Sequence, residues 1–130
     1  MDLPREWVEK AEFFRREVKR HLGENVYWIV CFEAQQAVEL YLRALAIKLT
    51  GLYEFTHDLS KLLKYLEDAG LKILGQLYVY ADALTPHYTL ARYPGSKPIE
   101  YDEAVARRCI EYMEKIVGWI LSEAEGASQA

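Results

Sequence analysis

Proline is absent from Arg5 to Thr85 of this 130-residue chain, whereas Pro86, Pro94 and Pro98 lie close together. Because proline lacks a backbone N–H and its ring clashes with the preceding helical turn, a proline-free stretch favours uninterrupted helices. With only seven glycines and four prolines, the chain is also poor in the turn residues that a β-sandwich or barrel needs at short intervals. The distribution predicts an all-α fold with one irregular segment, residues 85–101.

Apolar residues recur at helical spacing in five segments: 4–21, 26–50, 57–69, 72–84 and 102–125. Segment 26–50 is apolar on nearly every side, which is typical of a helix covered by several neighbours. We expect Asn25 and Thr56 to cap the helices that follow them, and Gly23 and Gly51 to end the helices before them. The pattern predicts one domain, residues 1–125, built as an antiparallel up-and-down bundle of four to five helices. Residues 126–130 are expected to fray.

Composition and charge limit the classes of function. Cys31 and Cys109 lie in helical patterns without CxxC spacing, which favours two reduced, buried thiols over a disulfide. The chain shows no apolar leader and no run of 18 uncharged apolar residues, so we expect a soluble, cytoplasmic protein without a membrane partner. Its net charge of −4 lacks the overall field of a nonspecific nucleic-acid binder but leaves room for a local basic patch.

Metal and cofactor patterns are missing from the sequence. His21, His57 and His87 are far apart, with no HExxH, no pair of ExxH motifs and no Cys/His cluster. Neither GxxxxGK[ST] nor GxGxxG occurs. We therefore expect neither a metal nor a cofactor.

Polar residues interrupt the most apolar segment: Gln35, Gln36, Glu39 and Arg43. Glu39 and Arg43 are spaced to pair on one helix face, and burying such groups is costly unless they are paired or hydrogen-bonded. Two interpretations remain open. These residues form an internal network or a narrow exposed face, or they form the polar wall of a groove or a dimer interface.

Two further places carry candidate site residues. His57 and Asp58 follow Thr56 at a predicted helix start, where capping explains the threonine and the aspartate but requires no histidine. Arg92 and Tyr93 lie in the irregular segment after His87, and arginine offers a planar fork suited to phosphate or carboxylate. Arg92 either binds a ligand or anchors the loop onto a helix end or onto Glu39.

A basic run closes the first predicted helix. It comprises Arg15, Arg16, Lys19, Arg20 and His21. Its cations either complement the negative end of the helix dipole on a solvated face or form a patch that contacts phosphate or RNA.

Taken in order, these pieces resemble the HEPN family (higher eukaryotes and prokaryotes nucleotide-binding domain). The resemblance is carried by CFEAQQAVELYLRAL (31–45), THDL (56–59), ARYP (91–94) and the closing amphipathic helix. It implies a helical bundle that dimerises and associates with nucleotides or RNA. It also implies a minimal nucleotidyltransferase as partner, in a toxin–antitoxin-like pair.

The family's ribonucleases carry Arg-x(4–6)-His near the later helices. Here Arg16-EVKR-His21 matches the spacing but lies in the first helix, and only the reversed order, His87-YTLA-Arg92, occurs in the later region. The sequence therefore favours a binding module without catalysis, whose binding residues are drawn from Gln35, Gln36, Glu39, Arg43, His57, Asp58, Arg92 and Tyr93. Two alternatives stay open: a metal-independent ribonuclease that uses Arg92 with His87 or His57, and a purely structural dimerisation domain.

Overall fold

The computed structural model describes residues 2–95 and 99–129. Its described residues form six helices and no strand: α1 (Arg5–Gly23), α2 (Tyr27–Thr50), α3 (Leu59–Asp68), α4 (Gly75–Leu84), α5 (His87–Leu90) and α6 (Glu103–Gln129). The all-α prediction is confirmed. Pro98 and Ala130, which belong to the expected irregular segment and the expected frayed tail, lie outside the described residues.

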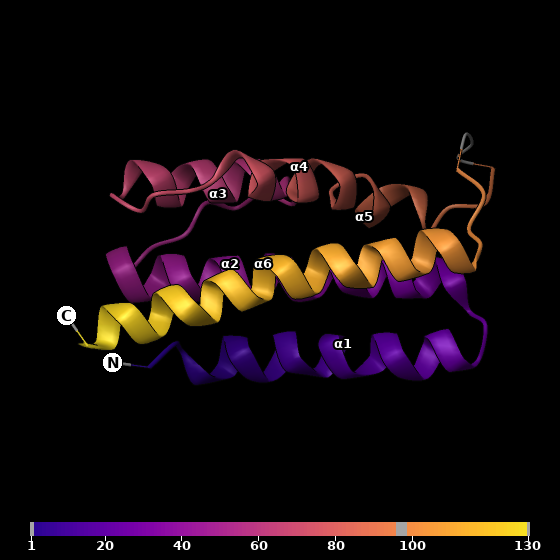
Figure 1. Cartoon of the computed structure of the whole chain (residues 1–130), viewed down its shortest axis with the longest axis horizontal. Helices are drawn as coiled ribbons and strands as arrows, with labels where there is room; N and C mark the ends of the chain where they lie inside the picture. The colour runs from indigo at the N-terminus through magenta and orange to yellow at the C-terminus, as the bar shows by residue number, and fades with distance from the viewer. Residues whose placement is uncertain (1, 96–98, 130) are drawn as a thin grey trace.

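The helices form a bundle whose two chain ends lie at the same end of the molecule (Figure 1). Helix α1 runs away from that end and α2 returns to it, then α4 and α5 run away again and α6 returns (Figure 1). Helix α3 packs against α2 and α4. In the described ranges no helix is long and apolar enough to cross a membrane.

Helix α2 is the central element of the core. It contacts α1, α3, α4, α5 and α6, which is why its apolar residues occur on every side. Alanines let α2 approach its neighbours closely, and Ala34, Ala37 and Ala44 are fully buried. Larger side chains from α3, α4 and α6 fill the rest of the core, among them Leu62, Leu63, Leu66, Leu84, Met113, Ile116 and Ile120.

Both predicted helix caps are wrong by one or two residues. Asn25 does not cap α2; it adopts a left-handed backbone with φ of 63° between α1 and α2, and the residue before α2 is Val26. Asparagine tolerates that conformation better than most residues. At α3 the capping side chain is Asp58, which accepts hydrogen bonds from the amides of Ser60 and Lys61, while Thr56 Oγ1 accepts one from the amide of Asp58.

Other helix boundaries also differ from the sequence pattern. Helix α4 begins at Gly75 rather than at residue 72, and α6 continues to Gln129, beyond the predicted end at residue 125. The segment 85–101 contains a helical turn, α5, directly after Pro86. Proline is compatible with the start of a helix because the first N–H groups have no partner within the helix.

Two glycines provide a matched test of the backbone. Gly51 ends α2 with φ of 82°, whereas Gly118 lies inside α6, and an added Cβ would meet no atom within 4 Å at either position. Gly118→Ala should stabilise the fold by roughly 0.5–1 kcal/mol because glycine is a poor helix former. Gly51→Ala should destabilise it by about 1–2 kcal/mol because a Cβ disfavours left-handed backbone. Urea unfolding of both variants measures the difference, and equal stabilisation by both would contradict the left-handed end of α2.

Candidate functional site

A buried carboxylate lies at the centre of the polar strip on α2. Glu39 is 2% exposed. Its Oε1 lies 2.9 Å from His57 Nδ1 and accepts a hydrogen bond of 3.1 Å from Gln35 Nε2, and its Oε2 lies 3.2 Å from Arg43 Nη2. A charge that is buried needs such partners, because transfer out of water without them is very costly. The predicted Glu39–Arg43 pair is confirmed.

The two glutamines extend this network towards the surface. Gln35 Nε2 also donates to the backbone oxygen of His57 at 3.0 Å, and Gln36 Nε2 donates to Gln35 Oε1 at 2.7 Å. Gln35 is fully buried, whereas Gln36 is half-buried. Gln35, Glu39 and Arg43 are buried and form an internal network, which is the first of the two interpretations. Gln36 reaches solvent, as does His57, which binds to the network.

Arg43 holds the loop between α2 and α3. Its Nη2 donates to the backbone oxygen of Thr56 at 2.9 Å, and its guanidinium carbon lies 5.2 Å from the ring centres of both Tyr53 and Phe55. Arg43 is 6% exposed. It therefore positions the chain that carries His57.

His57 connects the buried network to the surface. Its side chain is 39% exposed, against 3% for the side chain of Glu39 beneath it. Its ring stacks on that of Tyr88, with centroids 3.7 Å apart and planes inclined by 14°. Because Nδ1 is held by Glu39, Nε2 is the ring nitrogen left to exchange a proton or to bind a ligand.

Arg92 lies against the same aromatic ring. Its guanidinium carbon is 4.4 Å from the ring centre of Tyr88, 5.1 Å from that of Phe32 and 5.2 Å from that of Tyr93. Its Nε donates to the backbone oxygen of Tyr88 at 2.7 Å, so Arg92 anchors to α5 and not to Glu39. We call Glu39, His57, Tyr88 and Arg92 the His57–Arg92 site.

The charge of Arg92 has no counter-charge in the described ranges of the chain. No carboxylate there lies within ion-pair distance of it, and its two terminal nitrogens donate no hydrogen bond to a described residue. By contrast, the buried Arg43 is paired with Glu39. Arg92 is thus a cation fixed in direction by its aromatic neighbours, with the planar end of its fork available to an anion.

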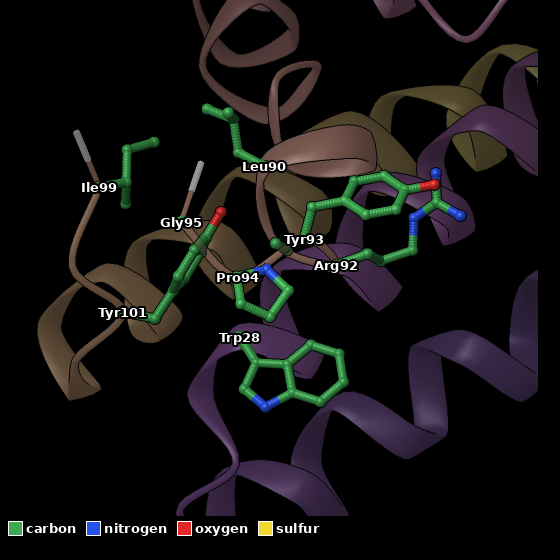
Figure 2. Close-up of a pocket in the computed structure, with 9 residues that line it drawn as sticks. Trp28, Leu90, Arg92, Tyr93, Pro94, Gly95, Ile99 and Tyr101 are labelled. Carbon is green, nitrogen blue, oxygen red and sulfur yellow. The ribbon is translucent and has the colours of Figure 1, made fainter. Parts of the chain in front are cut away.

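A pocket of about 410 Å³ adjoins Arg92. Figure 2 shows the tip of Tyr93 beside the guanidinium of Arg92, with the indole of Trp28 below Pro94 and with Tyr101 on the opposite side. Trp28 is 45% exposed and Tyr93 53%. Exposed aromatic faces next to a cation suit flat, negatively charged ligands.

Two predicted site residues have other partners. His87 is buried, and its Nδ1 lies 2.7 Å from the hydroxyl of Tyr101, so the structure brings Arg92 together with His57 and not with His87. Asp58 is occupied by the cap of α3.

The basic run on α1 is largely neutralised by acidic neighbours. Arg15 bonds to Glu12 and Glu114, Arg20 to Glu17 and Glu24, and His21 lies 2.7 Å from Glu33. The Arg15 guanidinium also lowers the pKa of Glu114. These pairs favour the interpretation of a solvated helix face over that of a phosphate patch.

Sequence reasoning missed Tyr88 and Phe32, two of the three aromatic residues that contact Arg92. Tyr88 precedes Arg92 by four positions, a helical spacing, but the prolines around it favour an irregular segment. Phe32 lies one helical turn before Gln36 and two before Glu39. This spacing alone could have placed Phe32 on the polar strip of α2.

Comparisons with known proteins agree with this architecture. A family model described as HEPN domain matches residues 4–124. The crystal structure of TT1696 from Thermus thermophilus superposes with a TM-score of 0.83 at 28% identity, covering 91% of this chain and 95% of that one. The crystal structure of ST0689, an archaeal HEPN homologue, superposes with a TM-score of 0.76 at 24% identity, covering 95% of this chain and 99% of that one. No curated protein sequence matches the chain.

Proposed function

Because the chain belongs to the HEPN domain family, we propose that it is a dimeric binding module that takes RNA or nucleotides at the His57–Arg92 site. The observation that carries the proposal is the guanidinium of Arg92, which is held over Tyr88 and whose terminal nitrogens have no ion pair or hydrogen bond with a described residue. A planar fork of this kind donates two parallel hydrogen bonds to phosphate oxygens.

The surroundings of Arg92 supply contacts for a base. Trp28 and Tyr93 line the adjoining pocket, and Phe55, 79% exposed, lies beside His57 with ring centroids 6.2 Å apart. Stacking of bases on such rings is the usual way in which proteins bind unpaired nucleotides. We therefore expect single-stranded RNA to bind with its phosphate on Arg92 and its bases on these aromatic side chains.

The overall charge is compatible with a small site. A protein with a net charge of −4 lacks long-range attraction for nucleic acid, so binding should depend on few phosphate contacts and should fall only gently with salt. At the site itself Arg43 is paired with Glu39, whereas Arg92 has no carboxylate partner among the described residues.

Arg92→Ala should weaken binding of a short single-stranded RNA about 10-fold or more, because one charge-assisted phosphate contact is lost. Fluorescence anisotropy at several salt concentrations measures the effect, and the salt slope should fall by about one phosphate contact. Arg107→Ala is the matched control, since Arg107 is exposed and already paired with Glu103. Equal loss in both variants, or no RNA binding by the unaltered chain, would contradict the proposal.

A second candidate function is RNA cleavage without a metal, and the bond between Glu39 and His57 favours it. A carboxylate that holds Nδ1 orients the imidazole and fixes its tautomer. His57 would take the proton of a 2′-hydroxyl, whose oxygen then attacks phosphorus, while Arg92 stabilises the charge that builds up on the phosphate oxygens. The P–O5′ bond breaks, the leaving oxygen takes a proton from water, and a 2′,3′-cyclic phosphate remains.

The ribonuclease candidate predicts RNA cleavage that persists in EDTA and is lost in His57→Ala and Arg92→Ala. Gel electrophoresis of end-labelled RNA follows the reaction, and the cyclic phosphate identifies its chemistry. His21→Gln serves as the comparison, because His21 lies against Glu33 and outside the His57–Arg92 site. Equal cleavage by Arg92→Ala and the unaltered chain would count against this function and leave the binding proposal in place.

Dimer formation belongs to the same proposal, as does association with a minimal nucleotidyltransferase. Large apolar side chains of the loop between α2 and α3 are open to solvent, including Leu52 at 69% and Phe55 at 79% exposure, and exposed apolar surface commonly marks interfaces.

Light scattering should give a mass of two chains, and Leu52→Glu should reduce it to one. A monomer with unaltered RNA binding would separate dimerisation from binding. If Arg92→Ala alters stability alone, the chain is a structural dimerisation domain.

A further inference from the structure

Three ligand-type side chains from separate helices meet outside the His57–Arg92 site. Cys31 lies near the start of α2, Cys109 lies 78 positions further along the chain near the start of α6, and His87 opens α5. Their exposed fractions are 0%, 3% and 6%. The two sulfur atoms and a ring nitrogen of His87 all lie within 4.8 Å of one another. Cys and His residues do not cluster along the sequence, but the fold brings these three together.

The chemistry of this cluster suits a borderline-soft cation. The two Sγ atoms lie 2.7 Å apart. Thiolate sulfur and neutral imidazole are the ligands that Zn²⁺ prefers.

The spacing of the three groups is close to that of ligands around one ion. With Zn–S bonds of about 2.3 Å and Zn–N bonds of about 2.0–2.1 Å, ligand atoms in a tetrahedral site lie roughly 3.3–3.8 Å from each other. The 4.8 Å limit and the 2.7 Å contact between the sulfurs lie on either side of this range. Adjustments of about 1 Å, within reach of side-chain rotation, would bring all three atoms onto one ion.

Tyr101 provides the outer contact that a ligating histidine needs. Its hydroxyl lies 2.7 Å from His87 Nδ1, and its ring meets the imidazole edge-on, with centroids 5.4 Å apart. When Nδ1–H donates to this hydroxyl oxygen, Nε2 carries the lone pair that a metal requires. A disulfide between Cys31 and Cys109 would use the same sulfurs but would leave the ring nitrogen of His87 that meets them without a ligand for its lone pair. The histidine thus favours a metal over a disulfide.

We propose that Cys31, His87 and Cys109 bind one Zn²⁺ per chain, with water as the fourth ligand. The ion joins the starts of α2 and α6 to the first residue of α5. Because Tyr88 follows His87 directly and Arg92 hydrogen-bonds to its backbone, the ion also fixes the helical turn that supports Arg92. The site does not depend on RNA binding or on cleavage.

The experiment uses the reduced full-length chain, stripped of metal with a chelator. Zn²⁺ is titrated in competition with a chromogenic chelator, and Co²⁺ is used as a spectroscopic probe of thiolate ligands. We expect one ion per chain and cobalt–thiolate charge-transfer bands. Cys31→Ser, Cys109→Ser and His87→Gln should each weaken Zn²⁺ binding by more than about 100-fold, and Tyr101→Phe by roughly 10-fold, as expected for an outer contact.

His21→Gln is the matched control, because His21 contacts Glu33 instead and should leave binding unchanged. Circular dichroism checks that each variant is folded, and Zn²⁺ should raise the melting temperature of the unaltered chain but not of the ligand variants. Three outcomes would overturn the proposal: no Zn²⁺ uptake while both thiols react with a thiol reagent, a chain lacking free thiols and lighter by two hydrogens, or undiminished binding by His87→Gln.

Discussion

The candidate site depends on a single buried charge, the carboxylate of Glu39. It lies on the helix that every other helix of the bundle contacts, where an unpaired charge would be very unfavourable. Its partners come from two sources: Gln35 and Arg43 on α2 itself, and His57 from the loop before α3. The need to satisfy Glu39 therefore fixes the conformation of that loop, and with it the direction in which His57 reaches the surface.

The second half of the site is built from residues 85–101, the segment that its prolines predicted to be irregular. A single helical turn after Pro86 stacks Tyr88 on His57 and places the backbone oxygen that holds Arg92. His87, one residue earlier on the same turn, faces the two cysteines. One short element thus links the surface site to a buried cluster, so the rigidity of that cluster bears on the position of Arg92.

Much of the fold could be predicted from the sequence, and the errors of that prediction concern helix ends and one short helix. The existence of the long helices, the central place of α2, its end at Gly51 and the Glu39–Arg43 pair were all predicted from residues within one segment. The predicted caps were wrong because Val26 follows Asn25 directly and Asp58 lies two residues after Thr56. Only the packing of the loops decides which of these residues takes the cap position. The sequence did not predict helix α5, because proline ends one helix and starts another with equal ease.

By itself, the sequence determined the helical bundle, the family resemblance that the comparisons confirm, and the polar strip on α2. These are properties of neighbours in the chain, repeated every three or four residues. Only the tertiary structure decided that Arg92 shares a site with His57 rather than with His87, and that Cys31, His87 and Cys109 meet. Such contacts join residues on separate helices, and their geometry is set by packing around α2, which no local pattern encodes.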